Sequence, residues 1–294
     1  MYPVMQKMMK FRSVFLLLAL VFVSSCGEYP RLQKTSDAEY KYEAAKAYFA
    51  QGKYGRASEL LGSLLATMKG TPYGEECLYL LGMSNLLHKD YESAGSYFQK
   101  YYQAYPKGIF VEPARYYTGY SLYKQSPDAR LDQASTQEAI HEFQTFLDHY
   151  PATQLKPQTQ EMIGLLQDRL VEKEYLAAKL YYDLGNYILN SLYSSSVSNY
   201  ESAVITAQNA LKDFPFASAS RREEFAILIL RSKYELARQS VEEKRVARFR
   251  DAIDEYYAFV NDFPESKYMQ EAKDILAAAE SIVKRKKLDI TQED

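Results

Sequence analysis

The sequence has no tryptophan, two cysteines and three histidines among its 294 residues. Two cysteines exclude the dense disulfide framework of small secreted domains, and three histidines leave little material for a histidine metal site. Glycine and proline are also scarce, with 12 and 10 residues. Because both residues interrupt regular structure, their scarcity favours long helices. Tyrosine, in contrast, occurs 28 times, and such a number of long side chains with so few helix breakers also indicates helices.

Motifs of catalytic chemistry are missing from the sequence. His141-Glu142 begins like the H-E-x-x-H motif of zinc proteases, but position 145 is Thr, so the second histidine ligand is absent. Neither the G-x-S-x-G motif of hydrolases nor an EF-hand calcium loop occurs. We therefore interpret the chain as a protein that is not an enzyme and that needs no metal or cofactor.

Residues 1–25 have the layout of a signal peptide, with basic residues ahead of an apolar run at 14–23. That run of about ten residues is too short to span a bilayer. The stretch Val23-Ser24-Ser25-Cys26 resembles the lipobox of bacterial lipoproteins, in which the cysteine thiol carries the lipid. We expect Cys26 to be lipidated and to become the mature N-terminus. The alternative is an ordinary signal peptide in which Cys26 is incidental.

The residue after Cys26 is Gly27, whereas many lipoproteins of the inner membrane have Asp there. We therefore expect an outer-membrane address on the periplasmic face, where acyl chains hold the protein without a transmembrane helix. Removing residues 1–25 changes the formal net charge from −2 to −5, which offers no basic excess for nucleic acid. Cys77 is left without a disulfide partner and is expected to be a small buried thiol.

Four segments of the mature chain align without gaps, and each begins with Ala and ends with an aromatic residue and Pro. They are AGSYFQKYYQAYP (94–106), AIHEFQTFLDHYP (139–151), AVITAQNALKDFP (203–215) and AIDEYYAFVNDFP (252–264). A fifth copy around Ala57 lacks the final proline. Each segment predicts a helix that ends at its proline and whose early Ala lets a neighbouring helix approach closely. A second helical stretch with a small residue precedes each copy, at Ala45, Gly82, Gly119, Gly185 and Ala237.

In the first two copies the small residue precedes the Ala by twelve positions, a spacing that resembles the tetratricopeptide repeat. The predicted fold is an all-α tetratricopeptide-repeat solenoid of about five helical hairpins with a C-terminal capping helix at 267–287. Extra residues before Ala139 and before Ala203 are expected to enlarge two turns. The predicted divisions are a signal peptide at 1–25, a lipid-anchored linker at 26–36, repeats 1–3 at 37–156, a long connecting helix with repeats 4–5 and the capping helix at 157–288, and a tail at 289–294.

In tetratricopeptide repeats, the fifth, ninth and twelfth positions of the first helix face the concave side. Counted from the small residue, the fifth positions of repeats 1–3 are Tyr42, Tyr79 and Tyr116, at intervals of 37 residues. The ninth and twelfth positions add Phe49, Met83, Tyr120 and Tyr123, together with Lys46 and Leu86. We predict that these side chains line a groove for a peptide with apolar side chains. The alternative is that they only fill the space between neighbouring helices.

Positive charge is concentrated in the predicted fifth repeat. Arg221 and Arg222 open its first helix, and seven further basic residues follow between 231 and 250. On an acidic chain this region is a candidate docking surface for an acidic partner, with Arg221 and Arg222 as the first candidates. The alternative is a set of solvated helix faces whose charges pair with nearby glutamates.

The lipobox, the five repeats and their division into three and two by a long helix resemble the BamD family, lipoproteins of the outer-membrane β-barrel assembly machine. The start CGEYPRLQKTSDAEYKYEAAKAYFAQGKYGRA and the end FVNDFPESKYMQEAK look like the Bacteroidetes forms of that family. The resemblance implies that repeats 1–3 receive the aromatic-ending C-terminal strand of unfolded barrel proteins. It also implies that repeats 4–5 dock on the barrel-forming subunit BamA, alongside the other lipoproteins of the machine.

Two other functions remain as alternatives. One is a different periplasmic tetratricopeptide adaptor lipoprotein, of the kind that coordinates cell division and envelope growth. Such adaptors often carry a coiled coil ahead of the repeats, for which the short linker at 26–36 leaves little room. The other is a glycan-binding lipoprotein, a class that usually needs long insertions and tryptophan for stacking on sugars, and this chain lacks tryptophan.

Overall fold

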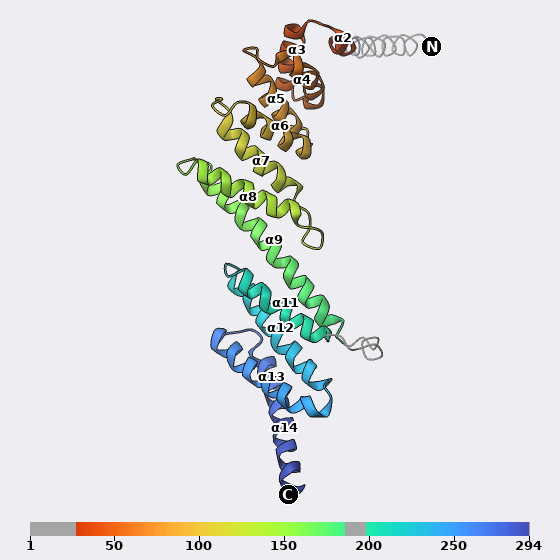
Figure 1. Ribbon diagram of the computed structural model, residues 1–294, viewed down its shortest axis with the longest axis vertical. Coiled ribbons are helices and arrows are strands. Elements are labelled where there is room, and N and C mark those ends of the chain that lie inside the picture. The colour runs from red at the N-terminus through yellow and green to blue at the C-terminus, as the bar shows by residue number, and fades with distance from the viewer. Residues whose placement is uncertain (1–27, 186–197, 294) are drawn as a thin grey trace, which may run out of the picture. The chain divides into compact units, whose positions relative to one another are not determined.

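The computed structural model describes residues 28–185 and 198–293, which fold almost wholly into helices (Figure 1). No strand occurs within these two ranges, and helices that are neighbours in sequence pack on one another, so the predicted all-α repeat architecture is confirmed. The chain divides into two compact units. Unit 1 contains residues up to 126 together with 134–163, and unit 2 contains 127–133 together with 164–294.

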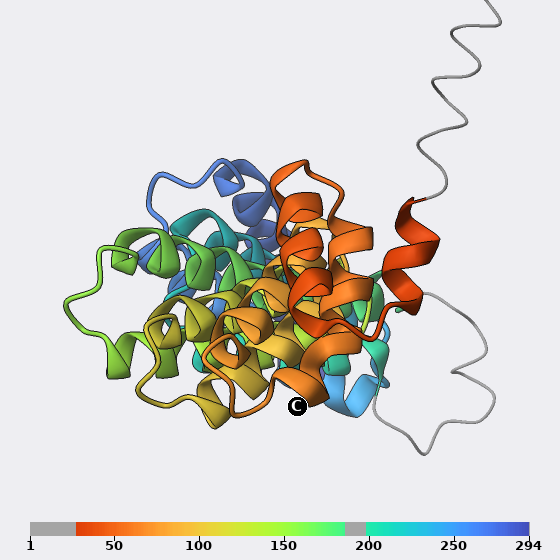
Figure 2. The same cartoon turned by 90° about the horizontal axis from the view of Figure 1, so that it is seen from above.

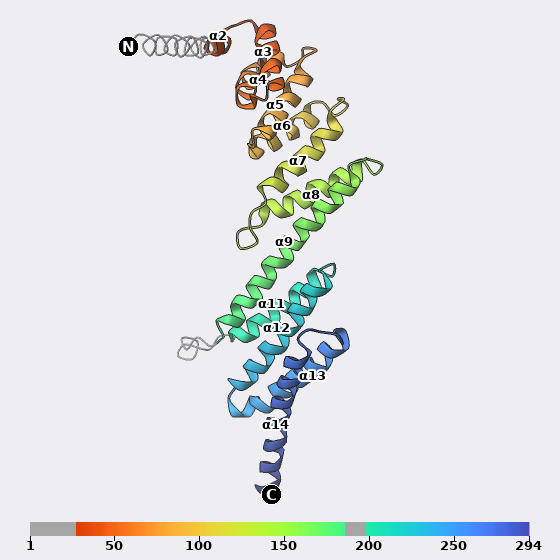
Figure 3. The same ribbon diagram turned by 180° about the vertical axis from the view of Figure 1, so that it is seen from behind.

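Unit 1 is built from three helical hairpins behind a short first helix (Figure 3). Its helices are α2 (Glu28–Lys34), α3 (Ala38–Ala50), α4 (Tyr54–Met68), α5 (Gly74–Leu87), α6 (Tyr91–Ala104), α7 (Val111–Gln125) and α8 (Ala134–His149). The hairpins α3–α4, α5–α6 and α7–α8 lie at the positions of the sequence repeats. The first turns of α9 (Lys156–Asp183) also belong to this unit.

The small residues of the repeat lie where the two helices of a hairpin cross. A Cβ atom on Gly119 would lie 2.7 Å from Cδ1 of Phe143, so only glycine lets the phenylalanine ring approach α7. The repeated alanines of α4, α6 and α8 are fully buried at the same crossings; they are Ala57, Ala94 and Ala139. The Ala and Gly positions that define the repeat in sequence therefore set how closely the helices pack.

The turns inside the first two hairpins share one backbone geometry. Gly52 and Lys89 both have left-handed φ angles, of 72° and 67°. In the first turn the amides of Gly52 and Lys53 donate back to α3, and in the second the amides of Lys89 and Asp90 donate back to α5. This arrangement is a common helix C-terminal motif in which glycine carries little strain. Lys89 adopts the same angle with a side chain attached.

The aromatic-Pro pairs end four of the helices. The aromatic residue follows the last helical residue in each case, and its backbone N–H donates to the carbonyl four residues earlier; these residues are Tyr105, Tyr150, Phe214 and Phe263. Proline then has no N–H to continue the ladder, so the helix stops. The Tyr105 ring packs on Tyr101 and the Phe263 ring packs on Phe259, so apolar surface also covers the ends of α6 and α13.

The short helix α2 lies in the segment predicted to be a linker, and it packs on the first hairpin (Figure 2). The hydroxyl of Tyr29 donates to the carboxylate of Glu59, and its ring meets that of Tyr48 edge to face at 5.5 Å. The guanidinium of Arg56 lies 4.9 Å from the Tyr29 ring. Helix α2 is therefore held against α3 and α4, because one tyrosine supplies both ring contacts and a hydrogen bond.

Unit 2 contains the rest of α9, then α11 (Asn199–Asp213), α12 (Ala219–Arg238), α13 (Glu242–Asp262) and α14 (Met269–Glu293). The structure differs from the expectation that Gly185 is the crossing residue inside the first helix of repeat 4. Gly185 follows the end of α9 and meets the Tyr200 ring, whereas Ala178 inside α9 is the small buried residue that packs with Ala207 and Phe225. The long helix therefore also serves as the first helix of the fourth hairpin.

The closing helix α14 is longer than the expected range 267–287. Its buried Ala272 packs with Ile227 and Phe259, and its buried Ala279 packs with Phe249. Two alanines seven positions apart lie on one face of a helix, so α14 closes the unit with a narrow stripe of small residues.

Candidate functional site

A continuous set of aromatic rings joins α5, α6 and α7 in unit 1. Tyr79 stacks on Phe110 with ring centroids 4.3 Å apart and an interplanar angle of 7°. Further ring contacts run from Tyr79 to Phe98, from Phe98 to Tyr117, and on through α7. We call this set the aromatic array; its members are Tyr79, Phe98, Tyr101, Phe110, Tyr116, Tyr117, Tyr120 and Tyr123.

The array brings together four of the residues that sequence spacing predicted for a groove. Tyr79, Tyr120 and Tyr123 are half-buried members, and Tyr116 is buried, with 6% of its surface exposed. Met83 is also half-buried and packs in the same hydrophobic cluster as Tyr79 and Tyr120. A surface of partly exposed rings and a flexible methionine can contact apolar side chains of a bound peptide.

Tyr42 and Phe49 lie in a separate cluster of the first hairpin. Tyr42 is fully buried beneath Tyr73, with ring centroids 5.5 Å apart. Phe49 is half-buried and its ring meets that of Tyr54 at 5.5 Å. The two residues therefore share the register of Tyr79 and Tyr116 in sequence, but they contact different rings.

Sequence reasoning missed Phe98, Tyr117 and Phe110, which complete the array. Phe98 stands four positions after the repeated Ala94, the same offset that places Phe143 after Ala139, so the repeat alignment contains a signal for it. Phe110 lies in the connection between α6 and α7, where the repeat pattern carries no information. The position of the Phe110 ring depends on the hydrogen bonds that hold this connection in place.

The connection between α6 and α7 is fixed by Glu75 of α5. Its carboxylate accepts a hydrogen bond from the Tyr101 hydroxyl and one from the backbone N–H of Ile109, at 2.8 Å. The Tyr101 oxygen in turn accepts from the backbone N–H of Phe110 at 3.0 Å. These bonds hold Phe110 over Tyr79 and leave the neighbouring Ile109 with 81% of its surface exposed. An apolar side chain on a braced connection extends the array toward solvent.

The phenols of Tyr79, Tyr101 and Tyr116 are neutral at physiological pH. Burial raises the pKa of Tyr79 and of Tyr116 to about 12, and burial together with the Glu75 hydrogen bond raises the pKa of Tyr101 further. A neutral phenol both donates and accepts hydrogen bonds. The array therefore offers apolar ring surface with polar groups that can meet a peptide backbone.

The two arginines predicted for docking have different environments in unit 2. The guanidinium of Arg221 is bound to the carboxylate of Glu172, to that of Glu224 at 2.7 Å, and lies 4.4 Å from the Tyr175 ring. Arg222 is exposed, and its Nη1 lies 3.4 Å from the carbonyl oxygen of Pro215. The charge of Arg221 is thus balanced inside the unit, whereas that of Arg222 faces solvent.

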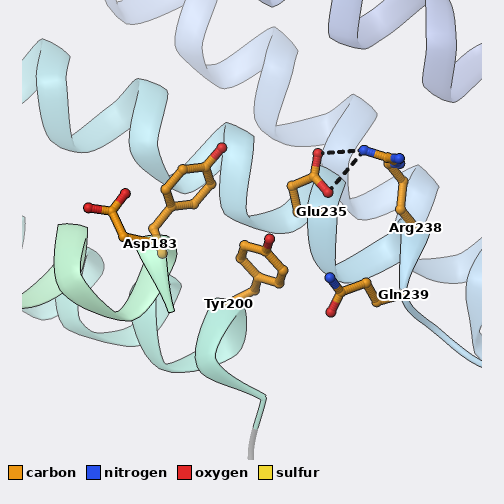
Figure 4. Close-up of a pocket in the computed structure, with 6 residues that line it drawn as sticks. Asp183, Tyr200, Glu235, Arg238 and Gln239 are labelled. Atoms are coloured by element: carbon orange, nitrogen blue, oxygen red, sulfur yellow. Dashed lines mark hydrogen bonds and ion pairs between the residues drawn. The ribbon is translucent and has the colours of Figure 1, made fainter. Parts of the chain in front are cut away.

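A polar pocket of about 450 Å³ lies between the end of α9, the start of α11 and the end of α12 (Figure 4). It is lined by Tyr182, Asp183, Tyr200, Glu235, Arg238 and Gln239. The carboxylate of Glu235 accepts two hydrogen bonds from Nη1 of Arg238, at 2.9 and 3.1 Å. In Figure 4 the Tyr200 ring stands between Asp183 and this ion pair. Burial and the Glu235 charge raise the pKa of Tyr200, so its hydroxyl is neutral.

The structure describes one of the two cysteines, Cys77. Cys26, predicted to carry the lipid, lies outside the described residues. Cys77 is fully buried in the first-hairpin cluster, where its Sγ lies 3.9 Å from the Leu61 carbonyl. Burial raises the pKa of the Cys77 thiol to about 12, so it stays protonated and chemically inert. Within the described ranges, no group of three His, Cys, Asp or Glu residues is placed to bind a metal ion.

Comparison with known proteins assigns the family. Residues 34–211 match the family YfiO, described as outer membrane lipoprotein. That match covers more than half of the chain. The chain belongs to this family. The match takes in all of unit 1 beyond residue 34 and reaches through α11 of unit 2, so the aromatic array lies wholly inside the YfiO match.

A curated relative gives a more specific likeness. The chain is 27% identical over 172 residues to a protein of Aquifex aeolicus (strain VF5), whose name is given provisionally as outer membrane protein assembly factor BamD. The aligned part spans 58% of this YfiO-family chain and 56% of the relative. Among the residues that the structure describes, no helix is long and apolar enough to cross a membrane.

Proposed function

We propose that this YfiO-family lipoprotein is an outer-membrane protein assembly factor, a scaffold that is anchored through lipid on Cys26 at the periplasmic face of the outer membrane. Family membership and the name of the Aquifex aeolicus relative support this proposal. In this role the protein performs no chemistry. It binds an unfolded β-barrel protein and the subunit that inserts it.

The aromatic array is the proposed binding surface for the unfolded substrate, and it is the single observation that carries the proposal. The half-buried rings of Tyr79, Tyr120 and Tyr123 belong to one network of ring contacts, and the exposed Ile109 precedes its member Phe110 in the chain. A barrel strand that ends in an aromatic residue would place that ring on the array, and the neutral phenols would meet its backbone. Partly exposed aromatic rings gathered in one region are typical of binding surfaces.

Unit 2 is the proposed docking region for a BamA-like barrel subunit and for other lipoproteins of the assembly machine. Arg222, which is exposed, is the residue of the predicted pair that has charge available for an acidic partner. Arg221 would support the same helix from inside through Glu172 and Glu224.

The substrate proposal is tested with a short peptide that ends in phenylalanine, bearing a fluorescent label, and the full mature protein. The double substitution Tyr120→Ser with Tyr123→Ser should weaken binding about tenfold, because two aromatic contacts are lost. Tyr40→Ser is the matched control, since Tyr40 is 54% exposed on α3 and outside the array. If the unsubstituted protein, the double variant and Tyr40→Ser all bound the peptide with equal affinity, the array would serve only the internal packing of unit 1.

The docking proposal is tested by purifying C-terminally tagged protein from the native outer membrane in mild detergent. We expect a BamA-like barrel to co-purify in near-equal amount and to be reduced by Arg222→Glu. Recovery of division proteins or sugar-uptake proteins without that barrel would instead favour the alternatives of an envelope adaptor or a glycan-binding lipoprotein.

A further inference from the structure

A second pocket of unit 2 lies where the end of α12 meets the first turns of α13 and the side of α14. It encloses about 390 Å³. Arg238, Arg245 and Arg285 line it, and Val246 and Ile282 contribute apolar surface beside the buried Phe249. We call it the arginine pocket. Its three arginines come from α12, α13 and α14 and surround apolar side chains.

The charges of the arginine pocket are not balanced by its own residues. Glu242 is the acidic residue that lines it, and its Oε2 lies 3.1 Å from Nη1 of Arg245. Arg238 is held from outside the pocket by Glu235, through Nη1. The two ion pairs fix the orientation of two guanidinium groups, and each guanidinium keeps further N–H donors. A fixed excess of positive charge attracts an anionic ligand.

Arg245 also has one donor that the structure leaves without a partner. Its Nε is buried and has no hydrogen-bond partner among the described residues. A buried N–H donor without a partner is costly, and most such groups in folded proteins are satisfied. The Nε of Arg245 is closed to a ligand, but arginine also binds carboxylates through its terminal N–H groups, so those of Arg245 and of the exposed Arg285 suit carboxylates of a ligand.

The apolar side of the pocket favours a ligand that also carries an apolar group. Phe249 is only 1% exposed, so the accessible apolar surface comes from the half-buried Val246 and Ile282. A protruding side chain of a ligand would contact these two residues. Val241, which precedes α13 and is 61% exposed, adds apolar surface beside Glu242. A peptide that carries carboxylates on both sides of a large apolar side chain matches this arrangement.

We propose that the arginine pocket binds an acidic peptide segment of a partner protein, with its carboxylates on Arg238, Arg245 and Arg285 and its apolar side chain against Val246 and Ile282. The proposal goes beyond the assembly function and does not depend on it. It assigns a binding site to the α12, α13 and α14 end of unit 2, away from Arg221 and Arg222 at the start of α12.

The test measures binding of a labelled, amidated peptide in which two glutamates flank a phenylalanine, with the full mature protein. We expect saturable binding that weakens as salt rises, and a loss of about tenfold on Arg245→Glu. Arg250→Glu is the matched control, because Arg250 is exposed on the same helix and does not line the pocket. Replacing the peptide phenylalanine by serine should also weaken binding.

Three outcomes would overturn the proposal: no binding of the peptide, equal binding by the Arg245→Glu and Arg250→Glu variants, or binding of phosphatidylglycerol vesicles in its place. Because Arg245→Glu could disturb α13, the exposed Arg285→Gln serves as a second variant, checked for folding by circular dichroism. Failure of this peptide test would leave the co-purification of a BamA-like barrel unaffected, so the two proposals fail separately.

Discussion

Gly82 of α5 and Phe98 of α6 lie so close that a Cβ atom on Gly82 would be 2.7 Å from Cε1 of the ring. Phe98 is fully buried and belongs to the aromatic array, so the ring has little room to move. The absence of a side chain at Gly82 therefore sets the distance between the two helices of the second hairpin and, with it, the position of the array.

Gly82→Ala should destabilise the protein by about 1–3 kcal/mol, because the added methyl overpacks the crossing. Gly62→Ala is the matched control: Gly62 lies inside α4, where an added Cβ atom would have no neighbour within 4 Å, so alanine should stabilise by roughly 0.5–1 kcal/mol. Urea unfolding measures both changes. A neutral Gly82→Ala variant would show that the helices separate without cost.

Lys89→Gly should stabilise the protein by about 1 kcal/mol, because Lys89 holds a left-handed φ of 67° that glycine adopts without steric strain. The equivalent residue of the first hairpin is already glycine, and Gly52→Ala should destabilise by a similar amount for the same reason. The free energies of unfolding in urea compare the pair. The two changes in the free energy of unfolding should have opposite signs. Changes of the same sign would contradict the shared turn geometry.

Tyr101→Phe should loosen the connection between α6 and α7, because it removes the hydroxyl that links Glu75 to the Phe110 amide. We expect a loss of about 1–3 kcal/mol and faster hydrogen exchange at the amides of Ile109 and Phe110. Tyr97→Phe, on the same helix, is the control. Unchanged exchange at both amides would show that the hydroxyl does not brace the connection.

Arg221→Gln should destabilise unit 2 by about 1–3 kcal/mol, since it breaks charge-assisted bonds to Glu172 and Glu224 and leaves their carboxylates without that partner. Arg222→Gln should change stability by less than about 0.5 kcal/mol, because its side chain is exposed. The thermal midpoints of both variants test this difference. If Arg222→Gln were the more destabilising change, the internal role of Arg221 would be refuted.

Stability should fall as pH rises from 10 toward 12. Tyr79 and Tyr116 have a pKa of about 12 in the folded chain, above the usual 10.0, so folding favours their neutral form. That contribution is complete below pH 10 and is lost as the pH passes through the folded pKa. Tyr79→Phe should lessen the decline measured by urea unfolding across this range, whereas Tyr40→Phe, at a 54% exposed ring, should not.

The repeats could be predicted from sequence because each feature acts locally. An aromatic-Pro pair ends a helix wherever it stands, and a small residue at a fixed offset marks a crossing, as Gly119 does opposite Phe143. The helical crossing expected at Gly185 was wrong because α9 is one uninterrupted helix that ends before this residue and whose buried Ala178 already supplies a small residue. Because Ala178 and Gly185 are close in sequence, the repeat pattern alone did not show which of them lies at the helix crossing.

The depth of each predicted groove residue could not be derived in the same way. Spacing places Tyr42, Tyr79 and Tyr116 on one helical face, but what covers them comes from elsewhere in the chain. Tyr73 covers Tyr42, whereas Phe110 leaves Tyr79 half-buried. The position of Phe110 depends in turn on a carboxylate 35 residues earlier, Glu75, and no local pattern encodes that contact.

The aromatic array also has an optical consequence. Its phenol rings lie 4.3–6.3 Å from their neighbours, and the chain contains no tryptophan to accept their excitation. Energy absorbed by one tyrosine therefore passes among tyrosines and leaves as tyrosine emission. A substrate strand that carried a single tryptophan would become the acceptor as soon as it lay on these rings, so the colour of the emitted light would report contact with unit 1 without any label on the protein.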